Sequence, residues 1–144
     1  MTSAISAHER VAQSLARQGM MNHLGVRLLS ATEGQVELAL PYSDKVTQQQ
    51  GGFHGGAMGA LADIAGGYAA LTVASEGMEV TTVEYKINFL ASFQGGEIRA
   101  IGRVTKAGKR IIVTTAELVH IDDSGKRSDC ALMQQTLVPV TKTY

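Results

Sequence analysis

Residues 54–75 read HGGAMGALADIAGGYAALTVAS and carry the strongest signal of secondary structure in the chain. It is apolar on nearly every side and rich in Ala and Gly, which is typical of a helix buried inside a protein. Seven of the sixteen glycines in the chain lie between positions 51 and 67. We expect the later ones, Gly59, Gly66 and Gly67, to thin a long central helix so that neighbouring backbone can approach it closely.

The rest of the chain has the pattern of strands. Residues 82–89 alternate between apolar and polar side chains, which is the period of a strand with one buried face. Turn residues bound further predicted strands at 26–32, 35–40, 97–106, 110–121 and 127–138. The short connections favour an antiparallel meander, and we expect a curved antiparallel β-sheet wrapped around the central helix, an α+β fold.

Length and composition predict a single domain over residues 1–144, because 144 residues form about one hydrophobic core. Residues 1–20 are expected to be a helical extension that docks through Val11, Leu15 and Met20. The N-terminus has no unbroken apolar run, so no signal peptide is expected. With its single Cys130, the chain fits a cytoplasmic protein.

Charge and motifs exclude several partners. Thirteen basic residues balance thirteen acidic ones, which argues against nucleic acid as the partner. A membrane span over residues 55–75 is disfavoured because Asp63 lies near its centre. The chain has no cluster of Cys and His, no GxGxxG and no phosphate-binding GxxxxGK[ST], so we expect neither a metal nor another cofactor.

Asp63 is the residue that most needs explanation, since a carboxylate inside an apolar helix is costly unless it is bonded, protonated or beside a wet cleft. One interpretation is a structural Asp bonded to a backbone amide or to His54. The other is catalytic. His54-Gly55-Gly56 stands at the predicted helix start, where free N–H groups and the helix dipole can bind an oxyanion.

The run from His54 to Asp63, together with TVEYKINFL at 82–90, resembles the hot-dog fold acyl-CoA thioesterases of the PaaI-like, phenylacetate-pathway type. The resemblance implies that Asp63 acts as general base or as nucleophile on the thioester carbon. It implies that the Gly55 N–H polarises the thioester carbonyl, that Gly56 permits the tight turn and that His54 shapes it. Related chains often have Asn where this chain has Gln48, so Gln48 or Gln49 is expected to position the attacking water.

The resemblance also implies a homo-oligomer, a dimer or a tetramer, with the site between two subunits. Thr81, Thr82 and Glu84 are then expected to line the site from the partner, although solvent-facing strand residues would look the same. A CoA substrate carries phosphates, and basic residues at 99, 103, 106, 109 and 110 are candidates to bind them, with Lys109 and Arg110 foremost. The alternative is that these basic side chains only keep a hairpin soluble.

The predicted function is hydrolysis of an acyl-CoA to a carboxylic acid and CoA. Two alternatives remain open from the sequence. One is a hot-dog module that binds acyl-CoA without hydrolysing it, and the other is an enoyl-CoA hydratase, whose chemistry usually needs a His/Asp or His/Glu pair. The acyl group is equally open, between a phenylacetyl type and a medium aliphatic chain.

Overall fold

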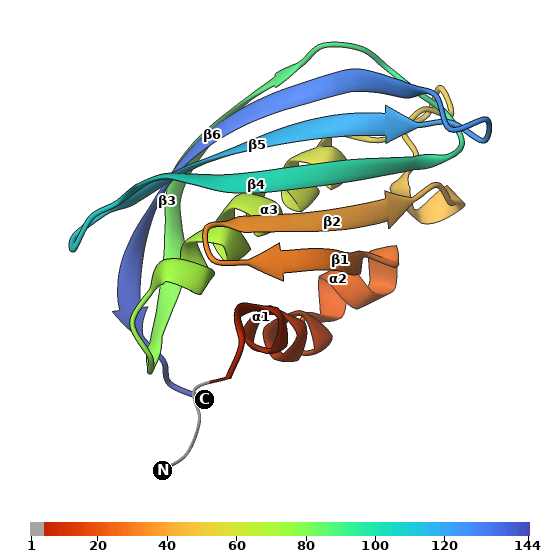
Figure 1. The fold of residues 1–144 in the computed structure, drawn as a ribbon. Helices are drawn as coiled ribbons and strands as arrows, with labels where there is room; N and C mark the ends of the chain where they lie inside the picture. The colour runs from red at the N-terminus through yellow and green to blue at the C-terminus, as the bar shows by residue number, and fades with distance from the viewer. Residues whose placement is uncertain (1–4) are drawn as a thin grey trace.

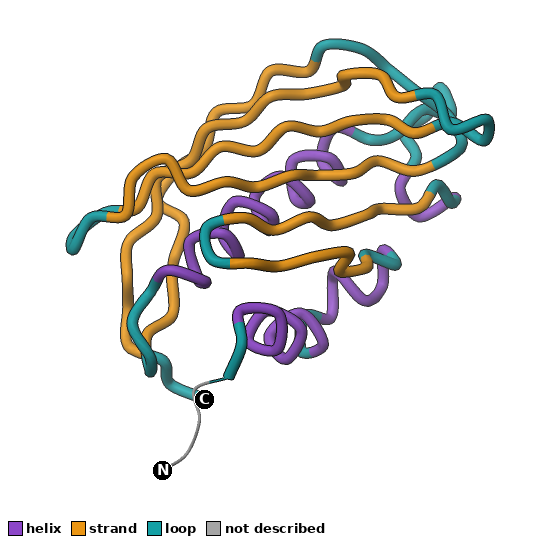
Figure 2. Tube along the Cα trace, in the orientation of Figure 1, coloured by secondary structure: helices purple, strands orange, loops and turns teal. Residues whose placement is uncertain are grey.

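The computed structural model describes residues 5–144 and consists of a curved sheet that arches over one long helix, α3 (Gly55–Val73) (Figure 1). All neighbouring strands pair antiparallel, in the order β1-β2-β4-β5-β6-β3. The strands are β1 (Arg27–Thr32), β2 (Gln35–Pro41), β3 (Met78–Phe89), β4 (Glu97–Ala107), β5 (Ile112–Ile121) and β6 (Arg127–Thr141). Figure 2 shows the strands curving around the helix, which confirms the expected α+β architecture.

The strand order differs from a full meander. Strands β4, β5 and β6 follow one another as predicted, but β3 pairs with β6 and not with β4. The free side of β4 is taken by β2, which pairs with it from Gln35↔Arg103 to Pro41↔Glu97. Strand β3 therefore lies at the edge of the sheet, where one of its sides has no strand partner within residues 5–144.

Helix α3 is apolar on most sides because the sheet surrounds it. Eleven of its residues are buried, and it packs against β2, β3, β4 and β5. By length and composition alone this helix passes as a membrane span. Its packing inside the curve of the sheet is that of a core helix and accounts for the same composition.

Two glycines bring helix and sheet together. A Cβ atom at Gly102, on β4, would lie 2.2 Å from the carbonyl oxygen of Ala65, and a Cβ at Gly66 would lie 2.1 Å from Oε1 of Gln135. The expected thinning of the helix is thus confirmed at Gly66. At Gly67 the expectation is wrong, because a Cβ there would make ordinary contact with Leu137 at 3.8 Å.

The N-terminal segment forms two helices, α1 (Ala7–Ala16) and α2 (Gly19–Leu24), and residues 1–4 lie outside the part of the chain that is described. Val11 and Leu15 are buried as predicted, but Met20 is exposed and Met21 is buried instead. The prediction for Met20 is wrong because the helix ends at Ala16 and a new one begins at Gly19, which changes the phase of the buried face.

Candidate active site

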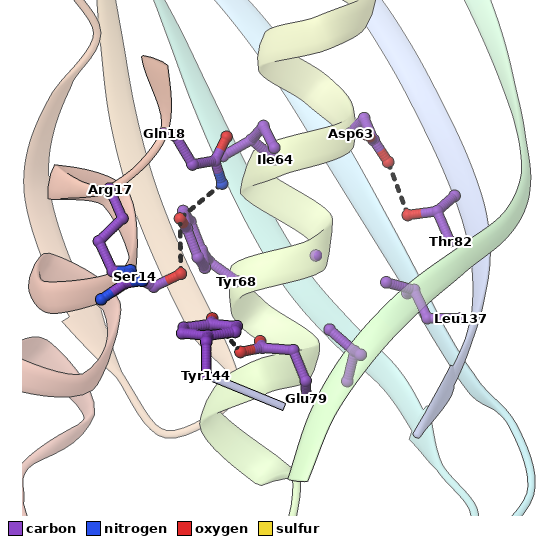
Figure 3. Close-up of a pocket in the computed structure, with 12 residues that line it drawn as sticks. Ser14, Arg17, Gln18, Asp63, Ile64, Tyr68, Glu79, Thr82, Leu137 and Tyr144 are labelled. Carbon is purple, nitrogen blue, oxygen red and sulfur yellow. Dashed lines mark hydrogen bonds between the residues drawn. The ribbon is translucent and has the colours of Figure 1, made fainter. Parts of the chain in front are cut away.

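Asp63 lies on α3 with its carboxylate held by two side chains from the sheet. Its Oδ1 accepts a hydrogen bond from Thr82 Oγ1 on β3 at 2.8 Å (Figure 3). It accepts another from Gln135 Nε2 on β6. Gln135 is fully buried and also donates to Thr82 Oγ1, while its Oε1 accepts from Thr114 at 2.9 Å. The partners of Asp63 are therefore neither a backbone amide nor His54, the two that the sequence suggested.

The second oxygen, Oδ2, has no hydrogen-bond partner within residues 5–144. Asp63 and Thr82 line one end of a cavity of about 540 Å³ (Figure 3). Ile64, Gly67, Val80 and Leu137 form its apolar wall. One carboxylate oxygen is thus fixed by the protein, and the other is left to a ligand or to water in a cavity of ordinary size for a small-molecule site.

The other end of this cavity is polar. The Tyr68 hydroxyl bonds to Gln18 Nε2 at 2.7 Å and to Ser14 Oγ at 3.0 Å, which joins α3 to the N-terminal helices. Burial raises the pKa of Tyr68 above its ordinary value, so the phenol stays protonated at neutral pH. Arg17, Glu79 and Tyr144 complete this end.

The start of α3 leaves one backbone donor free. His54 is the N-cap residue: its Nδ1 accepts from the Gly56 N–H at 2.7 Å, and its carbonyl oxygen accepts from the N–H groups of Ala57 and Met58. Among the first-turn amides, only the Gly55 N–H has no acceptor within the described chain. An N–H at a helix start, reinforced by the helix dipole, is suited to a carbonyl oxygen that gains negative charge.

Gln48 lies in the turn that precedes this helix start. Its backbone N–H donates to the Gly52 carbonyl at 2.9 Å, and its side-chain Oε1 accepts from the Gln50 N–H. Gln48 is half-buried and its Nε2 has no acceptor in residues 5–144, whereas Gln49 is exposed. Of the two predicted residues, only Gln48 has a side chain held in place beside the turn.

Aromatic packing that the sequence did not reveal supports the same turn. The Phe53 N–H donates to the Phe93 carbonyl at 2.9 Å, and the Phe93 ring stacks on buried His120 at 4.4 Å. His120 Nε2 in turn pairs with the Gly95 carbonyl at 2.9 Å. Phe53, Phe93 and His120 form no motif in the sequence. Only their contacts in the folded protein show that they support the turn before α3.

Asp63 and Gly55 are not brought together within one chain. Eight residues separate them on the same helix, which at 1.5 Å per residue is about 12 Å along its axis. To act on one carbonyl, the N–H must lie about 3 Å from its oxygen, and the carboxylate must reach its carbon directly or through one water molecule. Within one chain the two groups are too far apart for both to reach the same carbonyl.

The remaining predicted residues lie apart from the cavity or differ from expectation. Thr82 contacts Asp63 of its own chain, and its expected place in the site from the partner stays a prediction. Thr81 and Glu84 are exposed on β3, and Lys109 and Arg110 are exposed at the β4–β5 turn, and none of the four lines the cavity. Arg99 and Arg103 of the basic run pair with Glu97 and Glu117. Within the described chain, no three His, Cys, Asp or Glu side chains gather as a metal site.

Comparison with known proteins decides the family. Residues 50–125, just over half of the chain, match the model of the thioesterase superfamily. The chain belongs to this superfamily. A Saccharolobus solfataricus protein described as an esterase is 35% identical over 99 residues, which cover 69% of this chain and 70% of the relative. The 1,4-dihydroxy-2-naphthoyl-CoA hydrolase of Listeria monocytogenes is 26% identical over 118 residues, covering 82% and 85%.

Solved structures agree with this assignment. The thioesterase family protein from Silicibacter pomeroyi superposes with a TM-score of 0.89 and 36% identity, covering 93% of this chain and 98% of that one. The E. coli PaaI protein superposes with a TM-score of 0.81 over 96% and 99% of the two chains, and at 23% identity this likeness concerns the fold. The predicted PaaI-like, hot-dog resemblance is confirmed, and the protein is a thioesterase.

Proposed function

We propose that this thioesterase hydrolyses acyl-CoA thioesters with Asp63 as its catalytic carboxylate. The observation that carries the proposal is the half-bonded carboxylate: Oδ1 is fixed by Thr82 and Gln135, while Oδ2 is free at the end of the cavity. A group held in this way is positioned to take a proton or to attack a carbon. The name of the Listeria relative supports a CoA thioester as the substrate class.

The proposed reaction uses water as the second substrate. Asp63 Oδ2 takes a proton from water as the water oxygen bonds to the thioester carbon, and the Gly55 N–H donates to the carbonyl oxygen as it becomes negative. Gln48 orients the water through its unpaired Nε2. The carbon–sulfur bond then breaks, and the departing thiolate takes the proton from Asp63, which leaves a carboxylic acid and CoA. In the alternative route, Oδ2 bonds directly to the thioester carbon, the carbon–sulfur bond breaks, and the CoA thiolate leaves and takes a proton from solvent. Water then hydrolyses the resulting anhydride to the carboxylic acid and restores the Asp63 carboxylate.

We further propose that two copies of the chain complete each site, with Gly55 and Gln48 from one copy and Asp63 and Thr82 from the other. The separation of about 12 Å between Gly55 and Asp63 along α3 requires this arrangement if both act on one carbonyl. The edge strand β3 offers a surface for the second copy. It is twelve residues long and carries the exposed apolar side chains of Val83, Tyr85 and Phe89, and a long apolar edge is protected by pairing with another strand.

The structure favours hydrolysis over hydration of an enoyl-CoA. His54 and Asp63 are nine residues apart, and His54 Nδ1 is occupied by the Gly56 N–H. His54 does not line the cavity that contains Asp63, and its engaged Nδ1 argues against a role as the acid or base of a hydratase in a site shared by two copies. We also propose that Lys109 and Arg110 bind the phosphates of CoA. If they do, free CoA should inhibit the Lys109→Ala and Arg110→Ala variants less than it inhibits the wild type.

Asp63→Asn is the direct test. The Asn side chain retains an oxygen at the Oδ1 position, so Thr82 and Gln135 keep their acceptor, and only the free oxygen becomes an amide. We expect the melting temperature to stay near that of the wild type, while thiol release from acyl-CoAs falls by about 10²- to 10³-fold. Full activity in this variant, or no turnover of any acyl-CoA by the wild type, would refute the proposal.

Mixed oligomers test the shared site. Asp63→Asn and Gly55→Pro chains are each expected to be inactive, but a mixed dimer contains one site with both intact residues. Unfolding and refolding an equal mixture should restore about a quarter of wild-type activity, because half of the dimers are mixed and each has one good site. No recovery in a mixture that does refold would show that one chain supplies both groups.

A further inference from the structure

A second cavity adjoins the one that contains Asp63. It has a volume of about 840 Å³ and lies between α1, the start of β3 and the end of β6. Ser14, Arg17, Glu79 and Tyr144 line both cavities, whereas Asp63 lines only the inner one. These four side chains therefore form the partition between an inner space with the carboxylate and an outer space without it.

Tyr144 is the aromatic member of this partition, and three neighbours hold its ring. Its hydroxyl donates to the Glu79 carboxylate, the Arg17 guanidinium lies 4.7 Å from the ring centroid, and the Lys142 ammonium lies 4.9 Å from it. Cations over an aromatic face attract it. Figure 3 shows Tyr144 and Glu79 at the end of the lining opposite Asp63 and Thr82.

We propose that Tyr144 is a specificity-determining residue that limits the length of the acyl group. This inference rests on the proposed function. An acyl group whose thioester carbon lies at Asp63 extends along the apolar wall of Ile64, Gly67, Val80 and Leu137. Its far end then meets the Tyr144 ring, which lies between the two cavities.

The length of the cavity that contains Asp63 supports a limit on the length of the acyl chain. Along α3 the inner cavity is lined from Asp63 to Tyr68, a rise of about 7.5 Å for five residues. A longer acyl chain has to enter the outer cavity, whose lining includes the apolar side chains of Ile5, Leu71 and Met78. The outer space is thus able to accept a hydrocarbon tail, and the anchored Tyr144 ring stands in its way.

The test measures kcat/KM for straight-chain acyl-CoAs from butanoyl to tetradecanoyl. In Tyr144→Ala, the ratio of kcat/KM for tetradecanoyl-CoA to that for hexanoyl-CoA should rise by about tenfold or more over the wild type. Tyr144→Phe keeps the ring and should leave this ratio within about threefold. Glu79→Gln keeps the ring but weakens its anchor, so its ratio should lie between those of the other two variants.

An unchanged ratio in Tyr144→Ala, or equal shifts in the Ala and Phe variants, would overturn the proposal. Failure of the proposed function has a different signature, in which the wild type releases no thiol from any chain length. The length limit is then tested by binding: calorimetry measures Kd for the same CoA thioesters in the Asp63→Asn background, with and without Tyr144→Ala. Tighter binding of the long chains when Tyr144→Ala is added supports the limit, and no change in their Kd refutes it.

Discussion

Gln135, on β6, donates its side-chain amide to the carboxylate of Asp63 on α3, seventy-two positions away in the sequence. Because Gln135 is fully buried and its Oε1 accepts from Thr114, the amide has a single orientation, with its donors toward Asp63 and Thr82. The sheet thereby fixes the carboxylate that the helix presents. We regard Gln135 as a positioning residue, since it touches Asp63 and does not line the cavity.

Replacement of Gln135 by Leu should impair both stability and turnover. The change leaves the Thr114 hydroxyl without its acceptor and Asp63 with Thr82 as its remaining side-chain donor, which we expect to lower the free energy of unfolding by about 1–3 kcal/mol. A carboxylate that is no longer oriented should lower kcat by about tenfold or more. Urea denaturation and thiol release measure the two effects.

The neighbouring Gln134 provides the control, because it lies on the same strand but is exposed. Gln134→Leu should change both quantities little. Equal losses in the two variants would indicate a general disturbance of β6 and would contradict the assigned role of Gln135.

Gly55→Pro isolates the free N–H at the start of α3. Proline is well tolerated at the first position of a helix and has no N–H. The preceding His54 already has the extended backbone, with φ −70° and ψ 132°, that a residue before proline adopts. We expect a loss of about 10²- to 10³-fold in kcat with little change in melting temperature.

Gly55→Ala is the matched variant, since it introduces the same Cβ contact with Phe89, 3.2 Å away, but retains the N–H. It should keep most of the activity. If the Ala variant is as inactive as the Pro variant, crowding at Phe89 explains the loss and the N–H is not required.

Gly102→Ala should strongly destabilise the fold. The new methyl group would lie 2.2 Å from the backbone oxygen of Ala65, so helix and sheet must separate, at a cost of about 3 kcal/mol. Gly67→Ala, where the methyl group fits, should instead stabilise α3 by up to about 1 kcal/mol, since Ala favours helix. In urea denaturation, the midpoint should fall below that of the wild type for Gly102→Ala and rise above it for Gly67→Ala. A Gly102→Ala variant as stable as the wild type would contradict the prediction.

The Cys130 thiol should not react in the native protein. Burial raises its pKa to about 12, so the thiolate that attacks a labelling reagent is scarce throughout the physiological range. The unfolded chain loses this proton at a lower pH, so raising the pH past the ordinary thiol pKa favours unfolding. Labelling by a thiol reagent at about pH 8 should require urea, and rapid labelling of the folded protein would show that the thiol is accessible.

Local patterns in the sequence predicted α3 and the strands, but not the break between α1 and α2. The apolar run after His54 predicted α3, and alternation predicted the strands, because backbone periodicity depends on near neighbours in the chain. His54 as N-cap and Gly55 as free donor follow from their place at the helix start. The spacing of eight residues between Gly55 and Asp63 gives their separation along a straight helix once α3 is assigned.

Only the tertiary structure decided which distant residues meet. The pairing of β3 with β6 follows from β2 occupying the side of β4, and no pattern within β3 records this. Gln135 and Thr114 look like ordinary strand residues, yet they fix Asp63 because the curved sheet brings them beneath the helix. The cavity end at Tyr144 likewise depends on the last strand returning to α1. Such contacts depend on the packing of whole elements, which the local sequence does not encode.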